Sequence, residues 1–228
     1  MRNECKHIGL ILDGNRRWAK AHGFPAIEGH RQGYKNLKTI VEAAAKLNVK
    51  FISAYVFSSE NWTRSSDEVS GIMKLLLWVL KNEIKSFHKQ NVRILFAGCT
   101  DNLRPEIIKS LSLAEELTKN NTKITVVVCI NYGGRQEITD AVKKIIDSGL
   151  DSSKITDDIV QENLYQPNIP PPDLVIRTSG EQRLSNFLTW QSAYSELVFT
   201  DKLWPDFTAA DLKNCIGEFY KRTRRFGK

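Results

Sequence analysis

An apolar run near the start of the chain ends in a cluster of charged residues. In the stretch LILDGNRRW, residues 10–18, one carboxylate, Asp13, is followed closely by Arg16 and Arg17. Asp-Gly-Asn is typical of an ordinary turn, so a purely structural role is open at this point. Arginine presents a planar fork of donors that fits phosphate oxygens, whereas a carboxylate beside phosphates requires a cation such as Mg²⁺ between them. The chemistry that these residue types could support is therefore phosphate binding with a magnesium ion.

Similar polar clusters follow three other apolar runs. They begin where each run ends and cover residues 58–64, 131–135 and 177–185. A single arginine in such a place is usually a solvated surface charge, but several arginines at one edge of a sheet would form an anion-binding pocket. A second carboxylate, Glu196, could complete the magnesium site, although the stretch QSAYSELVF taken alone predicts an ordinary helix residue there.

The segments that must position these clusters alternate between two patterns. Short β-branched or apolar runs, typical of strands, occupy residues 7–12, 50–57, 92–98, 123–130 and 173–178. Helical patterns occupy residues 30–48, 67–90, 105–119, 135–148 and 209–225. The alternation predicts an α/β fold, with a single domain over residues 1–228 and a mostly parallel central sheet flanked by helices. In such a sheet, ligands bind beyond the carboxyl ends of the strands, where the polar clusters follow.

Hydroxyl residues mark several of the predicted helix starts. Ser65 and Glu68 have the spacing of a capping box, and Thr208 precedes the last helix. Thr156 could cap a short helix in TDDIVQENL, whereas PNIPPPD after it is typical of an extended connector. These signals support the predicted positions of the helices.

The helical pattern in VSGIMKLLLWVLKNEI, residues 69–84, is unusually apolar. Its apolar residues cover far more than the stripe that a one-sided helix needs. One interpretation is a helix buried in the core or in a dimer interface. The other is that one face packs on the sheet while another lines an apolar cavity.

Composition limits the protein class. The chain has 228 residues, of which 41% are hydrophobic, and its net charge of +7 favours an anionic partner: nucleic acid, a phosphorylated small molecule or an acidic membrane surface. Its four cysteines, Cys5, Cys99, Cys129 and Cys215, form no CxxC pair, which predicts a reducing compartment and no zinc site. The short apolar stretch at the N-terminus is not a signal peptide, and no run approaches a membrane span. We therefore expect a soluble, cytoplasmic protein.

Common phosphate-binding motifs are missing from the sequence, which disfavours a nucleotide-binding domain of the usual kinds. The sequence contains neither GxxxxGK[ST] nor GxGxxG, and the pair Asp157-Asp158 lacks the third aspartate of a DDxxD box. Phosphate recognition, Mg²⁺ and a very apolar neighbouring helix together indicate a substrate with a diphosphate head and an apolar tail.

At this level of detail the chain resembles the cis-prenyltransferase family, in particular the bacterial undecaprenyl diphosphate synthases. The resemblance runs nearly end to end through HIGLILDGNRRWAK, EGHRQG, YVFSSENWTR, NYGGR, DLVIRTSGEQRLSNFLTWQSAYSELVF, LWPDF and RRFG. It implies a Mg²⁺-dependent transferase that condenses isopentenyl diphosphate repeatedly, in cis, onto an allylic diphosphate, usually farnesyl diphosphate. It also implies that the apolar helix from Val69 onward is the wall of a tunnel for the growing chain.

The resemblance also implies roles for individual residues. Asp13 matches the essential aspartate that binds Mg²⁺ and the allylic diphosphate, Glu196 the second Mg²⁺ carboxylate, and Asn61 the proton acceptor. The groups around the allylic substrate match Gly14, Asn15, Arg16, Arg17, Trp18 and His30. The loop that closes over the substrates matches Ser58, Ser59, Glu60, Asn61, Trp62 and Arg64. The isopentenyl diphosphate site matches Arg177, Arg183, Leu184 and Ser185.

The family further implies a homodimer, in which a C-terminal motif matched by residues 225–227 reaches across to the partner, and a transient membrane-surface contact for product release. The sequence departs from the family pattern at Ala26, where most members have an arginine, and less seriously at Leu12 and Ser179. The segment between SSENWTR and NVRILFAG has no insertion, which favours an undecaprenyl product over longer chains.

Two other functions compete with this interpretation. Some relatives of the fold are non-catalytic partner subunits, but they lose the DGN aspartate or the RxG end, which are both present here. A nucleic-acid binder would suit the charge, yet no recognisable binding motif supports it, so we expect no nucleic-acid partner.

Overall fold

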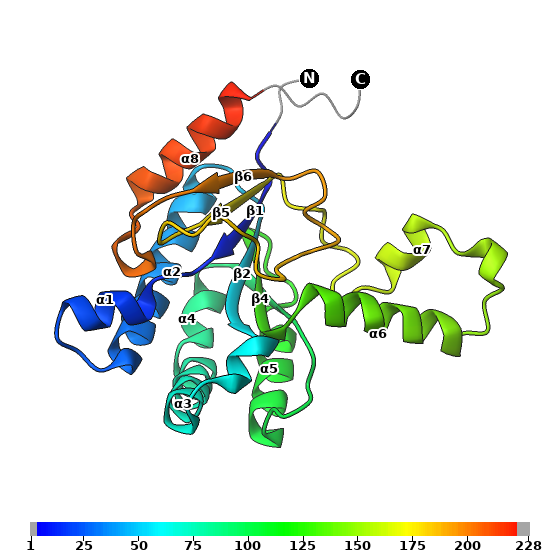
Figure 1. Ribbon diagram of the computed structural model, residues 1–228, viewed down its shortest axis with the longest axis horizontal. Helices are drawn as coiled ribbons and strands as arrows, with labels where there is room; N and C mark the ends of the chain where they lie inside the picture. The colour runs from blue at the N-terminus through cyan, green and yellow to red at the C-terminus, as the bar shows by residue number, and fades with distance from the viewer. Residues whose placement is uncertain (1–3, 223–228) are drawn as a thin grey trace.

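The computed structural model describes residues 4–222, and within them six strands form one sheet (Figure 1). The strand order is β3-β4-β2-β1-β5-β6, and every pairing is parallel. The strands are β1 (His7–Ile11), β2 (Phe51–Ser58), β3 (Val92–Ala97), β4 (Ile124–Tyr132), β5 (Leu174–Arg177) and β6 (Glu196–Phe199). The predicted α/β fold with a parallel sheet is confirmed. Because all strands are parallel, their carboxyl ends share one edge of the sheet.

Helices cover one face of this sheet most heavily. They are α1 (Asn15–Ala21), α2 (Ala26–Lys46), α3 (Ser66–Asn82), α4 (Ile84–Lys89), α5 (Pro105–Thr118), α6 (Gly134–Asp147), α7 (Asp157–Glu162) and α8 (Ala209–Lys221), with the short 3₁₀ turns η1 (Ser59–Thr63), η2 (Ser152–Lys154) and η3 (Trp204–Asp206). Helices α2 to α5 and α8 share the larger hydrophobic core with the sheet. On the other face, Ile169, Phe187 and Leu188 pack over the strands. Helices α6 and α7 extend away from the sheet (Figure 1). Among the described residues, no helix is long and apolar enough to cross a bilayer.

Three elements differ from the prediction. The stretch around Glu196 forms the edge strand β6, where a helix residue was expected, because Leu197 and Val198 pair with β5. Helix α1 was not predicted; it is short and buries only Ala19. The long helix predicted over residues 67–90 is divided at Glu83 into α3 and α4.

The predicted caps form. Thr208 accepts from the backbone N–H of Asp211, and Thr156 caps α7 in the same way. Ser65 accepts from Glu68 N at 3.4 Å, but the Glu68 carboxylate binds Arg64 instead of completing a capping box. The Glu68 side chain is therefore available to the site described below.

Two glycines of the EGHRQG motif allow α1 and α2 to pack closely. A Cβ atom at Gly29 would lie 2.0 Å from the backbone oxygen of Asn15, and one at Gly33 would lie 2.2 Å from Asn15 Oδ1. Real Cβ atoms do not approach backbone or amide oxygens so closely, so any side chain here would push α1 away. These glycines fix the position of Asn15 and of the arginines that follow it.

A buried histidine links the amino ends of the strands. His7, only 2% exposed, donates through Nδ1 to the Pro170 carbonyl oxygen, and its Nε2 accepts from the Ser53 hydroxyl at 2.9 Å. Burial lowers the pKa of His7 to about 4, so the ring is neutral at physiological pH. These two hydrogen bonds hold the connector before β5 against the centre of the sheet.

We expect acid to destabilise the protein through His7. Its pKa is near 6.5 in the unfolded chain and about 4 in the folded one, so between these values the unfolded chain binds the extra proton. The contribution of neutral His7 to the free energy of unfolding is complete above pH 6.5. It declines as the pH falls toward 4 and is smaller by roughly 2–3 kcal/mol at about pH 4.5. Urea unfolding of wild type and of His7→Gln, above pH 6.5 and at about pH 4.5, measures this difference. An equal loss of unfolding free energy in both proteins would exclude His7 as its source.

Candidate active site

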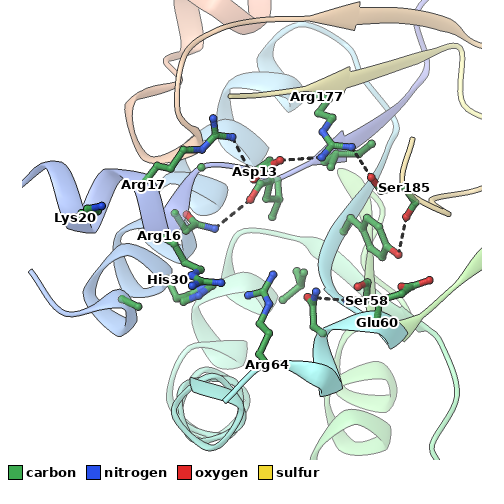
Figure 2. A pocket seen from close by; sticks show the side chains of 18 of the residues that line it. Asp13, Arg16, Arg17, Lys20, His30, Ser58, Glu60, Arg64, Arg177 and Ser185 are labelled. Atoms are coloured by element: carbon green, nitrogen blue, oxygen red, sulfur yellow. Dashed lines mark hydrogen bonds and ion pairs between the residues drawn. The ribbon is translucent and has the colours of Figure 1, made fainter. Parts of the chain in front are cut away.

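A polar pocket of about 980 Å³ opens at the carboxyl edge of the sheet (Figure 2). Asp13 follows β1 and Arg177 ends β5, and the pairing of Ile11 with Arg177 places these side chains on neighbouring strands. The strand order reverses here, since the chain continues from β1 to β2 on one side and adds β5 on the other. Such a reversal is where open α/β sheets bind ligands.

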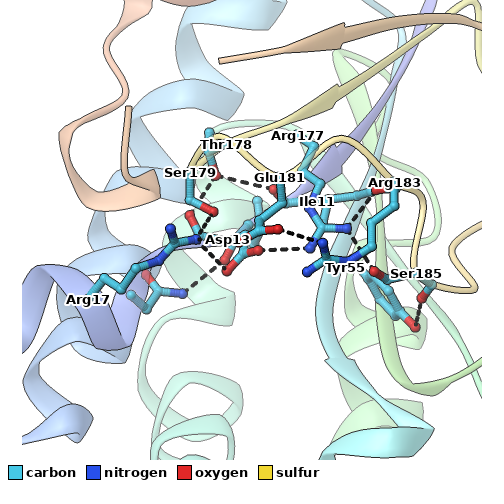
Figure 3. A network of polar contacts seen from close by, with 12 residues as sticks. Ile11, Asp13, Arg17, Tyr55, Arg177, Thr178, Ser179, Glu181, Arg183 and Ser185 are labelled. Atoms are coloured by element: carbon cyan, nitrogen blue, oxygen red, sulfur yellow. Dashed lines mark hydrogen bonds and ion pairs between the residues drawn. The ribbon is translucent and has the colours of Figure 1, made fainter. Parts of the chain in front are cut away.

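The centre of the pocket is an ion pair between Asp13 and Arg177 (Figure 3). Arg177 Nη2 donates to Asp13 Oδ2 at 2.8 Å, and Arg17 Nη2 lies 3.8 Å from Asp13 Oδ1. Arg17 also donates to the Ser179 hydroxyl and lies 3.8 Å from Glu181. The Asp13 carboxylate is therefore surrounded by guanidinium groups and still a third exposed to the pocket.

Arg177 also anchors the loop after β5. Its Nη1 donates to the backbone oxygen of Arg183 at 2.6 Å and to the Ser185 hydroxyl at 2.7 Å. The side chain is only 6% exposed, and its Nε has no hydrogen-bond partner within the described residues. A single buried guanidinium thus sets the distance between Asp13 and Ser185.

A second cationic cluster gathers around Glu68 at the start of α3. Arg64 Nη1 donates to Glu68 Oε1 at 2.8 Å, His30 Nε2 lies 3.6 Å from the same oxygen, and Arg16 Nη1 lies 3.7 Å from Oε2. Burial first, and then the charge of Arg64, lowers the pKa of His30, so the imidazole is neutral at neutral pH. Glu68 holds these three groups at the pocket wall without lining it itself.

The turn η1 closes the pocket on the side of β2. Asn61 Oδ1 accepts from the Ser58 backbone N–H at 3.2 Å, which caps the turn. Glu60 accepts from the Asn186 side chain at 2.8 Å and so connects η1 to the loop after β5. Tyr55 donates to the backbone oxygen of Ser185 from below.

Most of the predicted site residues meet in this one pocket. Those that line it are Asp13, Gly14, Asn15, Arg16, Arg17, His30, Ser58, Glu60, Asn61, Arg64, Arg177 and Ser185. Residues that do not line it are Trp18, Ser59, Trp62, Arg183, Leu184 and Glu196. The first group comes from segments far apart in the sequence, which the parallel sheet brings to one edge.

The two predicted tryptophans face elsewhere. Trp18 Nε1 donates to Asp206 at 2.8 Å, which holds the indole on the outer side of α1. Trp62 donates to Asn131 at 2.7 Å and packs on Phe57, 5.2 Å between ring centroids. Neither ring therefore lines the polar pocket.

Glu196 does not join Asp13 within this chain. It begins β6 at the amino end of the sheet and pairs with Arg222 at 2.8 Å, whereas Asp13 follows the carboxyl end of β1. At about 3.3 Å per strand residue the two carboxylates are roughly 15 Å or more apart. Within one chain the two carboxylates therefore do not share a site, and their pairing on Mg²⁺ stays a prediction. The predicted motif at residues 225–227 lies outside the described residues.

Several contributors were missing from the prediction. Lys20, Tyr55 and Asn186 line the pocket, and Glu68 supports it. Asn186 follows Ser185 and has a positive φ of 66°. The dipeptide Ser-Asn alone does not predict that this backbone turn brings Asn186 to the pocket. Glu68 did give a signal, because its cap spacing placed it one helical turn from Arg64.

An apolar cavity of about 120 Å³ lies next to the polar pocket. Helix α3 contributes Ile72, Leu76 and Leu80 to its wall, and the outer side of the helix carries Trp78, which is 50% exposed. Helices α2 and α4 and the sheet form the other walls. The face of α3 that lines this cavity also belongs to the larger core, so both features of the two interpretations are present, and a dimer interface on this helix stays a prediction. The pocket and the cavity share the lining residues Leu12, Asn15, His30 and Val56.

The donors around Asp13 suit one loosely held hard cation. Among residues 4–222, no group of three or more histidine, cysteine or acidic side chains could enclose a metal. Mg²⁺, however, is commonly bound by one or two carboxylates together with substrate phosphates and water. Asp13 supplies one carboxylate, and Glu181, which approaches the same Arg17 guanidinium, is the nearer second one.

A family model described as "Putative undecaprenyl diphosphate synthase" matches residues 11–227. The chain belongs to this prenyltransferase family. Isoprenyl transferase of Streptococcus pneumoniae is 48% identical over 97% of this chain and 91% of its own length. Isoprenyl transferase of Fusobacterium nucleatum is 47% identical over 99% of this chain and 97% of its own length. The family that the sequence resembles is therefore confirmed, and the chain is a transferase.

Solved structures of the family superpose over nearly the whole chain. Lavandulyl diphosphate synthase from Lavandula x intermedia, in complex with dimethylallyl diphosphate, has a TM-score of 0.93 and 33% identity, covering 98% of each chain. A probable undecaprenyl diphosphate synthase from Campylobacter jejuni has a TM-score of 0.85 and 34% identity, covering 99% of this chain and 100% of its own.

The departure of this prenyltransferase at Ala26 has a testable consequence. Ala26 is the first residue of α2 and lines the pocket near Arg16 and His30. Ala26→Arg should lower KM for the allylic diphosphate about tenfold, given ~1.5 kcal/mol for a charge-assisted hydrogen bond. Steady-state kinetics measures this, with Ala26→Gln as the uncharged control. An unchanged KM would mean that a group already present, such as Arg16, fills the role.

Proposed function

We propose that this prenyltransferase is a Mg²⁺-dependent enzyme that condenses isopentenyl diphosphate repeatedly, in cis, onto farnesyl diphosphate to make undecaprenyl diphosphate. One observation carries the proposal: a pocket rich in guanidinium groups shares its wall with an apolar cavity. The pocket and the cavity together match a ligand with a diphosphate head and a hydrocarbon tail. The guanidinium groups would bind the head, and the apolar walls would surround the tail.

In this proposal the allylic diphosphate binds beside Asp13 at the start of α1. Arg16, Arg17 and His30 supply donors there, and the backbone N–H groups at the helix start add to the attraction. Mg²⁺, when bound between Asp13 and the diphosphate, would neutralise charge that develops as the diphosphate leaves. Isopentenyl diphosphate would bind at Arg177 and Ser185, which are already held together by a hydrogen bond.

The remaining residues orient the substrates and accept a proton. Asn61 Oδ1 uses one lone pair for the Ser58 N–H, so a second lone pair remains for the proton that isopentenyl diphosphate loses. The apolar cavity behind Leu12 and Val56 would take the tail and keep water from the allylic cation. Homodimer formation, a cytoplasmic location and a membrane contact for product release stay predictions.

Incorporation of labelled isopentenyl diphosphate tests the function, with mass analysis of the product. We expect Mg²⁺-dependent incorporation on farnesyl diphosphate and a product of undecaprenyl length, lost in the presence of a chelator. Incorporation that stops at a short product would disprove the length. No incorporation at all would favour a non-catalytic partner subunit, and salt-sensitive gel shifts with nucleic acid would favour a nucleic-acid binder.

The cavity wall should set the length of the product. Replacing Ile72, Leu76 or Leu80 by tryptophan fills the cavity while the polar pocket stays unchanged, so early condensations should continue and longer products should disappear. Lys74→Trp, at an exposed position of the same helix, is the matched control. Full-length products from all three folded variants would show that the chain grows elsewhere.

A further inference from the structure

The end of α1 and the connection to α2, residues 20–25 and here called the α1–α2 turn, carry two rings of an exposed aromatic cluster that Trp18 of α1 completes. Trp18 and His22 stack with their ring centroids 4.2 Å apart, and Phe24 lies 6.1 Å from Trp18 at an interplanar angle of 26°. Phe24 is 50% exposed, and every residue from Lys20 to Pro25 is exposed to solvent. In Figure 1 this turn projects from the body of the molecule beside α1. Exposed aromatic rings do not contribute the stabilisation that burial of apolar surface gives, and an exposed apolar cluster indicates an interaction site.

The cluster has the chemistry of a membrane-interface anchor. The hydrogen bond from Trp18 to Asp206 turns the polar edge of the indole toward the protein and supports the stack from behind. Aromatic rings of this kind are enriched at the level of lipid headgroups, where a flat ring fits between polar and apolar layers.

One exposed cation, Lys20, lies beside the cluster. Of the other cations in residues 15–31, Arg16 is paired with Glu68, Arg17 with Asp13 and Glu181, and Arg31 with Glu28, while Asp206 accepts from Trp18. The Lys20 side chain is exposed to solvent at the end of α1. An anionic bilayer attracts such a segment, and each lysine or arginine near its surface contributes to binding.

The turn is continuous with the polar pocket. Lys20 and Phe24 both line the pocket that contains Asp13. A bilayer on this turn would therefore lie beside the pocket mouth, where a lipid diphosphate has to leave. The apolar area is confined to a small turn and is not a broad flat patch, which suits insertion among headgroups better than a protein interface.

We propose that the α1–α2 turn docks on an anionic lipid bilayer, with Phe24 among the headgroups and Lys20 against lipid phosphates. The use of this position for product release rests on the proposed function, whereas the binding itself does not. Trp78 provides a comparison, because it is equally exposed on α3 between Lys74 and Lys81 but does not line the polar pocket.

Vesicle co-sedimentation without substrates tests the proposal. The probes are vesicles of phosphatidylcholine mixed with phosphatidylglycerol, and vesicles of phosphatidylcholine alone. Wild type should bind the anionic vesicles and be released by high salt. Lys20→Gln should weaken binding about fivefold, the equivalent of ~1 kcal/mol per lysine, and Phe24→Ser about tenfold. Phe24→Trp should restore binding, and Trp78→Ser should bind as wild type does.

Besides release by inorganic diphosphate, three outcomes would overturn the proposal. They are no binding of wild type to anionic vesicles, unchanged binding of both turn variants, or loss of binding in Trp78→Ser in their place. Saturating inorganic diphosphate should leave vesicle binding intact; release by diphosphate would mean that the pocket holds a lipid headgroup and that the turn does not dock. Circular dichroism of each variant confirms the fold, and because no substrate is used, the result does not depend on catalysis.

Discussion

Asp13→Asn is expected to lower kcat for the first condensation at least a hundredfold. Asparagine keeps the volume and one carbonyl oxygen that can still accept from Arg177, so the fold should survive. The negative charge that would hold Mg²⁺ against the diphosphate is lost. An interaction that strengthens as the diphosphate leaves appears in the chemical step, and its loss is worth ~3 kcal/mol or more.

Single-turnover condensation at saturating Mg²⁺ measures this effect, and calorimetry measures the binding of farnesyl diphosphate. Binding should persist, because Arg16, Arg17 and His30 remain in the pocket. Asp147→Asn is the matched control, since this carboxylate is exposed at the end of α6 and does not line the pocket. Near-wild-type turnover in Asp13→Asn would refute the metal role, and lost binding with intact chemistry would make Asp13 a substrate anchor.

The sheet could be predicted from local patterns, but its last strand could not. Runs such as residues 123–130 are long, β-branched and buried on both faces, so period and composition agree. Strand β6 has only four residues, and it becomes a strand because Leu197 finds Val175 on β5 as its partner. The division of the long helix at Glu83 also depends on tertiary contacts, since Lys38 of α2 binds the Glu83 carboxylate at 3.1 Å.

The site was predictable where it follows strand ends. Asp13 and Arg177 meet because parallel strands share a carboxyl edge, which the alternation of patterns already implied. The direction of individual side chains was not predictable. Trp18 is next to Arg17 in sequence, yet its ring turns outward to Asp206, 188 residues away. The position of Glu196 required a strand that the local pattern did not indicate.

Arg177→Met is expected to cost far more stability than Arg183→Met. By resemblance both arginines belong to the isopentenyl diphosphate site, but Arg177 is only 6% exposed and Arg183 is 59% exposed. Removing Arg177 leaves the Asp13 carboxylate, the Arg183 carbonyl and the Ser185 hydroxyl without their shared donor. Breaking a buried ion pair from one side typically costs 3–5 kcal/mol, and because Asp13 is a third exposed we expect about 3 kcal/mol.

Urea unfolding of the two variants at neutral pH decides between a structural and a purely substrate-binding role for Arg177. The Arg183 side chain makes an exposed ion pair with Glu181, so Arg183→Met should change the free energy of unfolding by ~0.5 kcal/mol or less. Arg177→Lys should fall between the two, because an ammonium keeps the charge near Asp13 but cannot reach all three acceptors. If Arg177→Met and Arg183→Met unfold alike, the guanidinium serves the substrate alone. A large loss confined to Arg177→Met would mean that this side chain builds the pocket, because its guanidinium donates both to Asp13 and to Ser185.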